Sequence, residues 1–230
     1  MTADLNGRVV VVAGAAGAAG PPLVQALARA RATVVAVDRD RSLVDPLADE
    51  RVEPEVCDLL DEADTRALAT RVLDRHGRVD GLAHLVGGWR GGKSITESDL
   101  ADWAFLEGLL VRTLQHTSRA FHDPIRKAGG RLCIVSSSQA GQPTATNAAY
   151  AAAKAAAEAW TLAVADSFTG SEAAAVILTV KALVTPQMRA AKPDKAFQGF
   201  TDVGDLATEI CQLWEMPAAE LNGQRLVQIP

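Results

Sequence analysis

The feature that most constrains the fold is a glycine-rich turn between an apolar run and a helical segment near the amino end. Residues Val9–Ala13 are almost all β-branched, which is typical of a central parallel strand covered on both faces. The run leads into Gly14-Ala-Ala-Gly17-Ala-Ala-Gly20 and then into a helical segment that extends to about Arg31. Glycines permit positive φ and let the backbone approach a pyrophosphate at the amino end of a helix. Strand, turn and helix in this order predict a βαβ unit of the dinucleotide-binding kind.

Apolar strand-like runs and helical segments alternate along the rest of the chain. Further strands are expected at residues 33–37, 51–57, 81–86, 130–135, 173–180 and 224–229. Helices are expected at residues 61–75, 97–127, 150–168 and through Trp214. This alternation predicts an α/β fold in three αβα layers, a Rossmann-like doubly wound parallel sheet of about seven strands. At this length we expect one domain over residues 1–230.

Composition and charge narrow the classes of partner. With 23 basic and 28 acidic side chains the net charge is -5, which argues against nucleic acid as a partner. Residues 9–28 carry no charge, but three glycines and Pro21-Pro22 interrupt the run, so no membrane association is expected. The three cysteines indicate a reduced, cytoplasmic protein without disulfides. The four histidines show no metal-ligand spacing, and no metal is expected.

A cluster of polar residues follows the strand expected at 130–135. Three consecutive serines, residues 136–138, lie at its carboxyl end, the edge at which open α/β sheets bind ligands. Tyr150 and Lys154 are four residues apart on the next helix and can point into the same space. An ammonium lowers the pKa of a nearby phenol, and a serine hydroxyl can hydrogen-bond a reacting oxygen. The alternative interpretation is an Ala-rich helix on which Lys154 and Glu158 form an ordinary surface pair.

The glycine turn, the serines and Tyr150-Ala-Ala-Ala-Lys154 together resemble the short-chain dehydrogenase/reductase family, over essentially the whole chain. The resemblance implies reversible hydride transfer between a nicotinamide cofactor and a small-molecule carbonyl or alcohol substrate. Tyr150 would act as general acid/base, Lys154 would lower its pKa and hold the nicotinamide ribose, and a serine would orient the carbonyl. A second class stays open: a protein of this fold that binds a nucleotide or a partner subunit without turnover.

Two counts disagree about which serine acts. Counting back from Gly141, where relatives have Ser-x-x-Gly, selects Ser138. Counting from the strand start selects Ser137, and Tyr150 then lies at the family's usual interval of 13 residues. Side chains alternate along a strand, so neighbouring serines cannot both face the cofactor. Loops absorb insertions more readily than strands, and we therefore expect Ser137 to be catalytic.

The cofactor is expected to be NAD. Asp38 ends the second strand, 18 residues beyond Gly20, where a carboxylate accepts hydrogen bonds from the ribose hydroxyls and repels a 2′-phosphate. Arg39 and Arg41 keep NADP open, since either could pair with that phosphate. The residues expected to bind the cofactor are Gly14, Gly17, Ala18, Ala19, Gly20, Asp38, Arg39, Asp58, Leu59, Gly87, Tyr150, Lys154 and Thr185.

The chain departs from the family pattern at several positions. Ala18 stands where the usual Gly-x-x-x-Gly-x-Gly has its middle glycine, and Val180-Lys181 replaces Pro-Gly. His84-Leu85-Val86-Gly87 replaces Asn-Asn-Ala-Gly, and we expect His84 to be a hydrogen-bonded core residue. Leu110 falls at the position of an asparagine that completes a proton relay in relatives.

The sequence does not identify the substrate. Its pocket is expected to comprise Trp89, residues 139–147 and a lid over residues 186–200 with Gly199 as a hinge. Relatives are commonly oligomers through their long fourth and fifth helices, and the Ala-rich face of residues 151–165 permits close helix packing. A homodimer or homotetramer is therefore expected.

Overall fold

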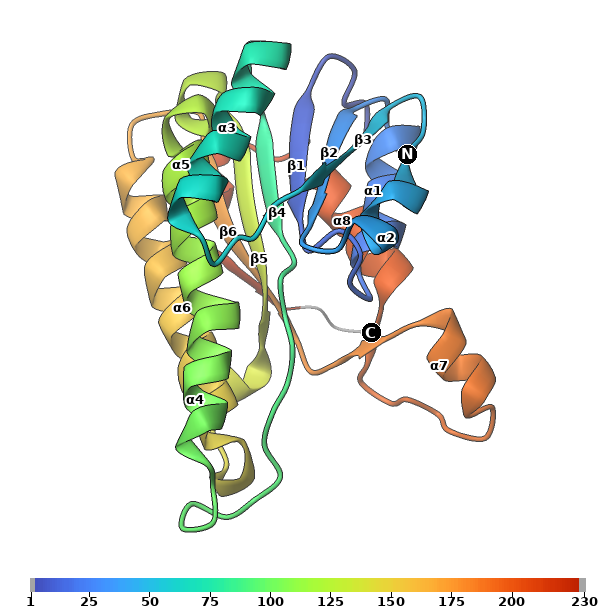
Figure 1. Ribbon diagram of the computed structural model, residues 1–230, viewed down its shortest axis with the longest axis vertical. Helices are drawn as coiled ribbons and strands as arrows, with labels where there is room; N and C mark the ends of the chain where they lie inside the picture. The colour runs from blue at the N-terminus through green and yellow to red at the C-terminus, as the bar shows by residue number, and fades with distance from the viewer. Residues whose placement is uncertain (1–2, 228–230) are drawn as a thin grey trace.

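Seven parallel strands form the central sheet of the computed structural model, which describes residues 3–227 (Figure 1). Their spatial order is β3-β2-β1-β4-β5-β6-β9. The strands are β1 (Val9–Ala13), β2 (Thr33–Asp38), β3 (Val52–Val56), β4 (Gly81–His84), β5 (Arg131–Ser137), β6 (Ala174–Val180) and β9 (Arg225–Val227). The predicted doubly wound sheet of seven strands is confirmed, and each expected strand agrees within a few residues.

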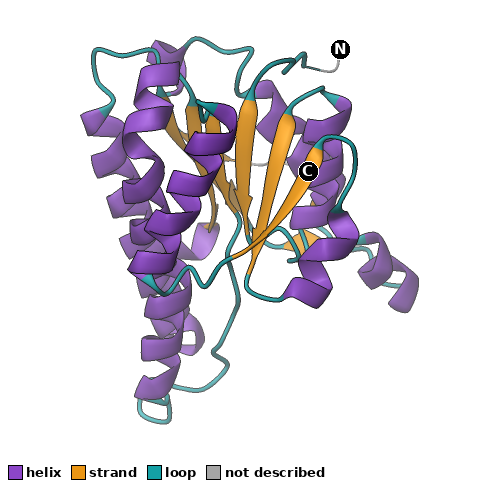
Figure 2. Cartoon of the chain, turned by 45° about the horizontal axis from the view of Figure 1, so that its top comes forward, coloured by secondary structure: helices purple, strands orange, loops and turns teal. Residues whose placement is uncertain are grey.

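Helices cover both faces of the sheet (Figures 1 and 2). One face carries α3 (Glu62–His76), α4 (Leu100–Glu107), α5 (Thr113–Ala128) and α6 (Ala148–Ser167). The other face carries α1 (Gly20–Arg29), α2 (Arg41–Val44) and α8 (Val203–Gln212). The shorter elements are α7 (Pro186–Ala191), α9 (Ala218–Leu221), η1 (Asp45–Leu47), η3 (Ser138–Ala140) and η4 (Ala145–Asn147). None of the described helices is long and apolar enough to span a bilayer.

The alternation of side chains along β1 explains the two-sided core. Val10 and Val12 are buried with apolar residues of α1 and α8 on one face of the sheet. Val9 and Val11 are buried with apolar residues of α3, α5 and α6 on the other. Because successive strand residues point to opposite faces, an unbroken valine run gives both helical layers an apolar surface to pack against.

The helical region expected at residues 97–127 is interrupted. Between α4 and α5 the backbone makes a π-helical turn, η2 (Gly108–Arg112), in which the Thr113 amide donates to the Gly108 carbonyl. Pro124 lies within α5 and does not end it. A π turn carries one residue more than an α turn, so α4 and α5 present their side chains in different registers.

Two short strands were not anticipated from the sequence. β7 (Leu183–Val184) pairs in parallel with β8 (Thr201–Asp202). The pair lies at the base of an excursion that includes α7 and projects from the body of the sheet (Figure 1). This excursion contains the residues expected to form a lid. The last strand was expected at 224–229; it occupies Arg225–Val227, and residues 228–229 lie outside the described residues.

Candidate active site

A cavity of about 710 Å³ opens at the carboxyl ends of the strands. It lies where the strand order reverses, because β1 is flanked by β2 on one side and by β4 on the other. Such a switch point is the ligand-binding position of open α/β sheets. Of the residues predicted to act, the cavity wall contains Gly14, Gly17, Ala18, Ala19, Asp38, Arg39, Asp58, Leu59, Gly87, Ser137, Tyr150 and Lys154. The structure therefore brings together most of the predicted site.

The glycine turn holds β1, β4 and α1 close together. Gly14 has φ of +79°, and a Cβ on it would lie 2.8 Å from the Val86 backbone nitrogen. A Cβ on Gly20 would lie 2.0 Å from the Ala15 carbonyl oxygen. Gly20 is thus required for packing beneath the turn and is not part of the cavity wall. The first turn of α1 contains Pro21 and Pro22, which have no amide hydrogen, and the Gly20 amide donates to the Gly17 carbonyl oxygen at 3.0 Å. The turn residues Ala18 and Ala19, just before the helix, line the cavity.

Asp38 connects the end of β2 to the glycine turn. Its Oδ2 accepts a hydrogen bond from the Ala16 amide at 3.1 Å, and its Oδ1 accepts one from the Arg39 amide at 2.8 Å. A carboxylate has about four acceptor positions, so these two contacts leave capacity for ribose hydroxyls. Arg39 also lies in the cavity wall.

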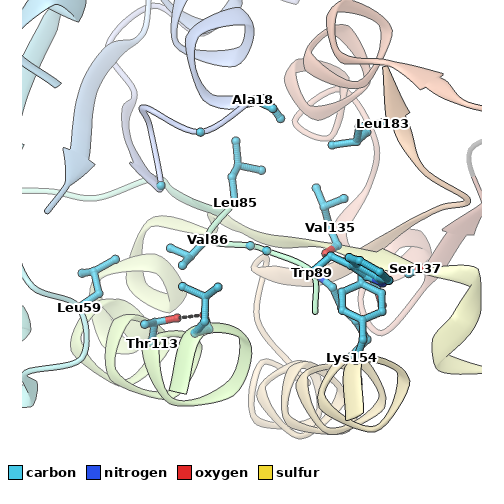
Figure 3. Close-up of a pocket in the computed structure, with 18 of the residues that line it drawn as sticks. Ala18, Leu59, Leu85, Val86, Trp89, Thr113, Val135, Ser137, Lys154 and Leu183 are labelled. Atoms are coloured by element: carbon cyan, nitrogen blue, oxygen red, sulfur yellow. Dashed lines mark hydrogen bonds between the residues drawn. The ribbon is translucent and has the colours of Figure 1, made fainter. Parts of the chain in front are cut away.

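Ser137 and Tyr150 meet at the other end of the cavity. Figure 3 shows Ser137, Lys154 and Trp89 grouped there, across the cavity from Leu59. Burial raises the pKa of the Tyr150 phenol, and the hydrogen bond from Ser137 lowers it. Ser138 is exposed in the following turn. The strand count, which selects Ser137, identifies the serine that contacts the phenol.

Lys154 is buried beside Tyr150, and its ammonium is held by the backbone of β5. Its ammonium lies 5.9 Å from the centre of the Tyr150 ring and donates to the Val135 carbonyl oxygen at 2.8 Å. Burial lowers the pKa of Lys154 to about 8. In this arrangement burial raises the pKa of Tyr150 and the Ser137 hydroxyl opposes that effect, while the effect of Lys154 on the phenol stays a prediction.

His84 is a core residue, as expected. Its ring is buried, with Nε2 3.2 Å from Thr113 Oγ1 and Nδ1 3.1 Å from Thr117 Oγ1. Burial and the nearby Lys154 lower the pKa of His84 to about 3. The imidazole is therefore neutral and links β4 to α5.

The π turn determines which residue faces the cavity. Leu109 lines the cavity, whereas Leu110 is buried in an apolar cluster with Leu106 and Ala153. The position expected to hold an amide is thus filled by packed hydrocarbon. The two segments replaced relative to the family, residues 84–87 and 180–181, both contribute to the cavity wall.

Thr185 lies outside the cavity wall. Its hydroxyl accepts from the Met188 amide at 3.1 Å and caps the start of α7. Lys181 does line the cavity, and its ammonium donates to the Gln198 carbonyl at 3.4 Å. Lys181 thereby connects the end of β6 to the segment expected to be a lid.

Several cavity residues were not predicted from motifs. Most of them lie at the ends of the parallel strands or at the start of the following segment, which is the signal that could have identified them. Leu109 and Thr113 belong instead to the π turn and the start of α5, for which the sequence contains no such signal. They are Cys57, Leu60, Leu85, Val86, Gly88, Leu109, Thr113, Val135, Ser136, Val180, Lys181, Ala182 and Leu183.

Trp89 forms the outer wall with the loop before α6. The indole Nε1 donates to the Asn147 Oδ1 at 3.1 Å. Nearby, the Gly92 amide donates to the Thr146 carbonyl oxygen at 2.7 Å. The segment after β4 is therefore joined to a loop more than fifty residues later in the chain. Trp89 and Gln139, both predicted for the substrate pocket, line the cavity.

The residues present fit a dinucleotide. Small-molecule sites typically occupy about 300–1,000 Å³, and the cavity lies within that range. The glycine turn before α1 lets a pyrophosphate approach the backbone of Gly14, Gly17, Ala18 and Ala19 in the cavity wall. Asp38 suits a ribose. Among the described residues, no group of three or more His, Cys, Asp or Glu side chains could hold a metal ion.

Comparisons with known proteins agree with this geometry. Residues 8–196 match the family described as short chain dehydrogenase. An uncharacterized oxidoreductase of Staphylococcus haemolyticus is 26% identical over 158 residues, covering 66% of this chain and 68% of the relative. The 7alpha-hydroxysteroid dehydrogenase of Escherichia coli K12 is 28% identical over 160 residues, covering 66% of this chain and 62% of that enzyme.

Solved structures match over nearly the full length. The 3-ketoacyl-(acyl-carrier-protein) reductase of Brucella melitensis, complexed with NADH, has a TM-score of 0.87 and 25% identity, covering 98% of both chains. A short chain oxidoreductase of Pseudomonas aeruginosa with NADPH bound has a TM-score of 0.86 and 22% identity, covering 98% of this chain and 96% of that one. The second of these comparisons concerns the fold alone.

The chain belongs to the short-chain dehydrogenase family. It is accordingly an NAD(P)-dependent oxidoreductase that acts on small molecules.

Proposed function

We propose that the protein transfers a hydride between a nicotinamide cofactor and a carbonyl or alcohol substrate, with Tyr150 as the general acid/base. The observation that carries the proposal is that Ser137, Tyr150 and Lys154 line the same dinucleotide-sized cavity, with Ser137 close enough to the phenol to lower the pKa of Tyr150. The cofactor supplies or accepts the hydride when bound. In reduction, Tyr150 gives its proton to the carbonyl oxygen while Ser137 donates a hydrogen bond to the same oxygen.

The other residues of the proposed site bind the cofactor. Lys154 lines the cavity beside Tyr150 and donates hydrogen bonds to the nicotinamide ribose. Gly14, Gly17, Ala18 and Ala19 support the pyrophosphate, and Gly20 fixes the turn beneath them. Asp58, Leu59 and Gly87 flank the adenine and the chain of the dinucleotide. Thr185 reaches the cofactor when the lid over residues 186–200 closes.

NAD(H) is the proposed preference. Asp38 retains free acceptor capacity for two ribose hydroxyls, and its charge opposes a 2′-phosphate. NAD(H) should bind more tightly than NADP(H) by about tenfold, the scale of one good polar contact. Tighter binding of NADPH in a direct fluorescence titration would instead assign Arg39 to the phosphate.

Tyr150→Phe tests the catalytic assignment. Reduction should be screened over a panel of ketones and aldehydes, with the cofactor absorbance as readout. The variant should lose turnover by at least ~10²-fold and keep NADH affinity within about threefold of the unaltered protein, since the phenol hydroxyl acts on the substrate. Retained turnover would exclude Tyr150 as the acid. Binding of NADH without turnover of any compound would favour the non-catalytic alternative.

We further propose one domain over residues 1–230, a cytoplasmic location and a homodimer or homotetramer. The three cysteines are free and buried, which suits a reducing compartment. A groove of about 340 Å³ between α5 and α6, with Trp160 in its wall, supports pairing through these helices. The substrate itself is proposed only as a small carbonyl or alcohol.

A further inference from the structure

A buried carboxylate lies one helical turn beyond Lys154. Glu158 follows Lys154 by four residues and Tyr150 by eight, so the three lie on one side of α6. Glu158 and Lys154 are each only 8% exposed. The interpretation of this pair as an ordinary surface pair is therefore wrong. A buried carboxylate is costly unless it is paired and hydrogen-bonded, and its presence here requires an explanation.

Both oxygens of Glu158 have partners from the sheet. Oε1 accepts a hydrogen bond from the Ser136 hydroxyl at 2.5 Å, and Oε2 accepts one from Arg225 Nε at 2.8 Å. Ser136 immediately precedes the serine that contacts the phenol, and Arg225 is the first residue of β9. The Arg225 side chain is 48% exposed. The ion pair of Arg225 and Glu158 therefore extends from the protein surface to the interior side of α6.

The surroundings of Lys154 contain few charges. From β4 it faces the neutral His84, and from β5 the Val135 carbonyl oxygen. From its own helix it faces the un-ionised phenol of Tyr150 and the carboxylate of Glu158. The π turn contributes only apolar groups to the cluster packed on α6. Arg225 lies on the far side of the carboxylate, so Glu158 is the charge that opposes the effect of burial on Lys154.

We propose that Glu158 is a positioning residue that keeps Lys154 cationic beside Tyr150, held in place by Ser136 and Arg225. The proposal rests on the proposed function of Lys154. The two side chains are buried one helical turn apart on α6 and bond to neighbouring residues of β5, Lys154 to Val135 and Glu158 to Ser136. Burial lowers the pKa of Lys154 and Glu158 offsets part of that effect, with a net value of about 8. A merely structural connection between α6 and β9 would tolerate an amide, whose oxygen can accept from Arg225 while its NH2 group donates to the Ser136 hydroxyl oxygen.

Glu158→Gln separates the two roles, and the chain allows a direct readout. With six lysines in the sequence, the protein labelled with [13Cε]lysine gives a resolvable NMR titration without cofactor or substrate, and Lys154→Arg identifies the signal. In the unaltered protein the midpoint should lie near 8. Glu158→Gln should lower it by about one pH unit, the scale of losing a nearby opposite charge. At pH 7.5 the cationic fraction then falls about threefold.

Arg225→Gln is the matched control. It removes the other partner of the same carboxylate and the connection to β9, but it leaves the negative charge. The Lys154 midpoint should stay within about 0.3 unit of the unaltered protein or rise, because a cation has been removed. If Glu158→Gln does not fold, Glu158→Met has a similar volume and should produce the same fall. An unchanged midpoint in the Glu158 variants, or an equal fall in Arg225→Gln, would overturn the proposal.

A second measurement links the titration to the site. NADH affinity, followed by fluorescence, should weaken as pH rises through the Lys154 midpoint, and in Glu158→Gln the weakening should begin at correspondingly lower pH. If the NMR midpoint shifts but NADH does not bind at any pH, the proposed function fails while the role of Glu158 stands. If NADH binds and the Lys154 midpoint does not shift, the role of Glu158 fails while the proposed function stands.

Discussion

At the scale of single residues, Tyr150 can be observed directly. It is the only tyrosine in the chain, so phenolate absorbance reports its ionisation without interference from other phenols. Its pKa should lie above the usual value of about 10, because burial raises it. Ser137→Ala should raise the pKa further, since the Ser137 hydrogen bond lowers it. Alkaline difference spectra, with circular dichroism to verify folding, provide the measurement.

Ser138→Ala is the control for this titration. Ser138 is the exposed neighbour in the following turn, and its removal should leave the phenol's pKa unchanged. With a substrate in hand, Ser137→Ala should also lower turnover by at least ~10²-fold, on the scale of losing a positioned transition-state donor. Equal effects of the two variants on both measurements would show that Ser137 has no special role.

The pH dependence of reduction tests Lys154. The folded-state pKa of Lys154 is lowered to about 8, so the side chain is cationic below that pH and neutral above it. The phenol keeps its proton well beyond this point because its pKa is raised. The rate of reduction should therefore be constant near pH 6–7 and fall as pH rises through about 8. A fall in rate that begins only above about pH 10 would assign the decrease to ionisation of Tyr150 instead.

At the scale of elements, the π turn explains why one leucine faces the cavity and the next does not. Leu110→Asn should not lower turnover if the relay position benefits from an amide. It should reduce the free energy of unfolding by about 2–4 kcal/mol, because apolar packing is lost and an amide is buried without a partner. Chemical denaturation and initial rates on the same preparation provide the test.

Leu109→Asn is the matched control for the π turn. Leu109 is only half-buried and lines the cavity, where water can satisfy an amide. Its substitution should cost clearly less stability than that of Leu110. Similar losses at the two positions would mean that the leucines are packed alike, contrary to the register given by the turn.

The regular elements were predictable, and the irregular ones were not. β-branched runs such as Val9–Ala13 give strands because their side chains pack on a pleated surface covered on both faces. The π turn at Gly108–Arg112 has no periodic signal, since the apolar pattern there is compatible with an α-helix. The two-residue strands β7 and β8 are too short to leave a pattern. They form where the two ends of the excursion around α7 lie side by side, so that Leu183 pairs with Thr201 and Val184 with Asp202.

The residue types of the site were also predictable, but their electrostatics were not. Spacing places Tyr150 and Lys154 on one helical face, and strand alternation selects Ser137. The pKa of the Tyr150 phenol depends on how deeply its side chain is buried and on how close the Lys154 ammonium lies. A sequence gives neither quantity. The same holds for Glu158, whose position four residues after Lys154 is equally consistent with solvent and with the core.

At the scale of the whole molecule, the outer face of α5 and α6 is the surface proposed to form the oligomer. Light scattering should give two or four times the chain mass of 24.1 kDa. Ala163→Glu, an exposed position in the groove between these helices, should reduce the mass to that of one chain by placing a charge in the contact. Ala67→Glu, on the exposed side of α3, should leave the mass unchanged. Dissociation by both variants, or by neither, would contradict this surface.

The hydrogen bonds of Trp89 to Asn147 and of Gly92 to Thr146 have a practical consequence for engineering. The two segments form one wall, so exchanging either alone for that of a relative would leave broken hydrogen bonds at the mouth of the cavity. A chimaera with altered substrate preference should therefore graft residues 87–92 and 144–147 from the same donor protein. Recombination at a single crossover between the two segments would separate the two parts of this wall.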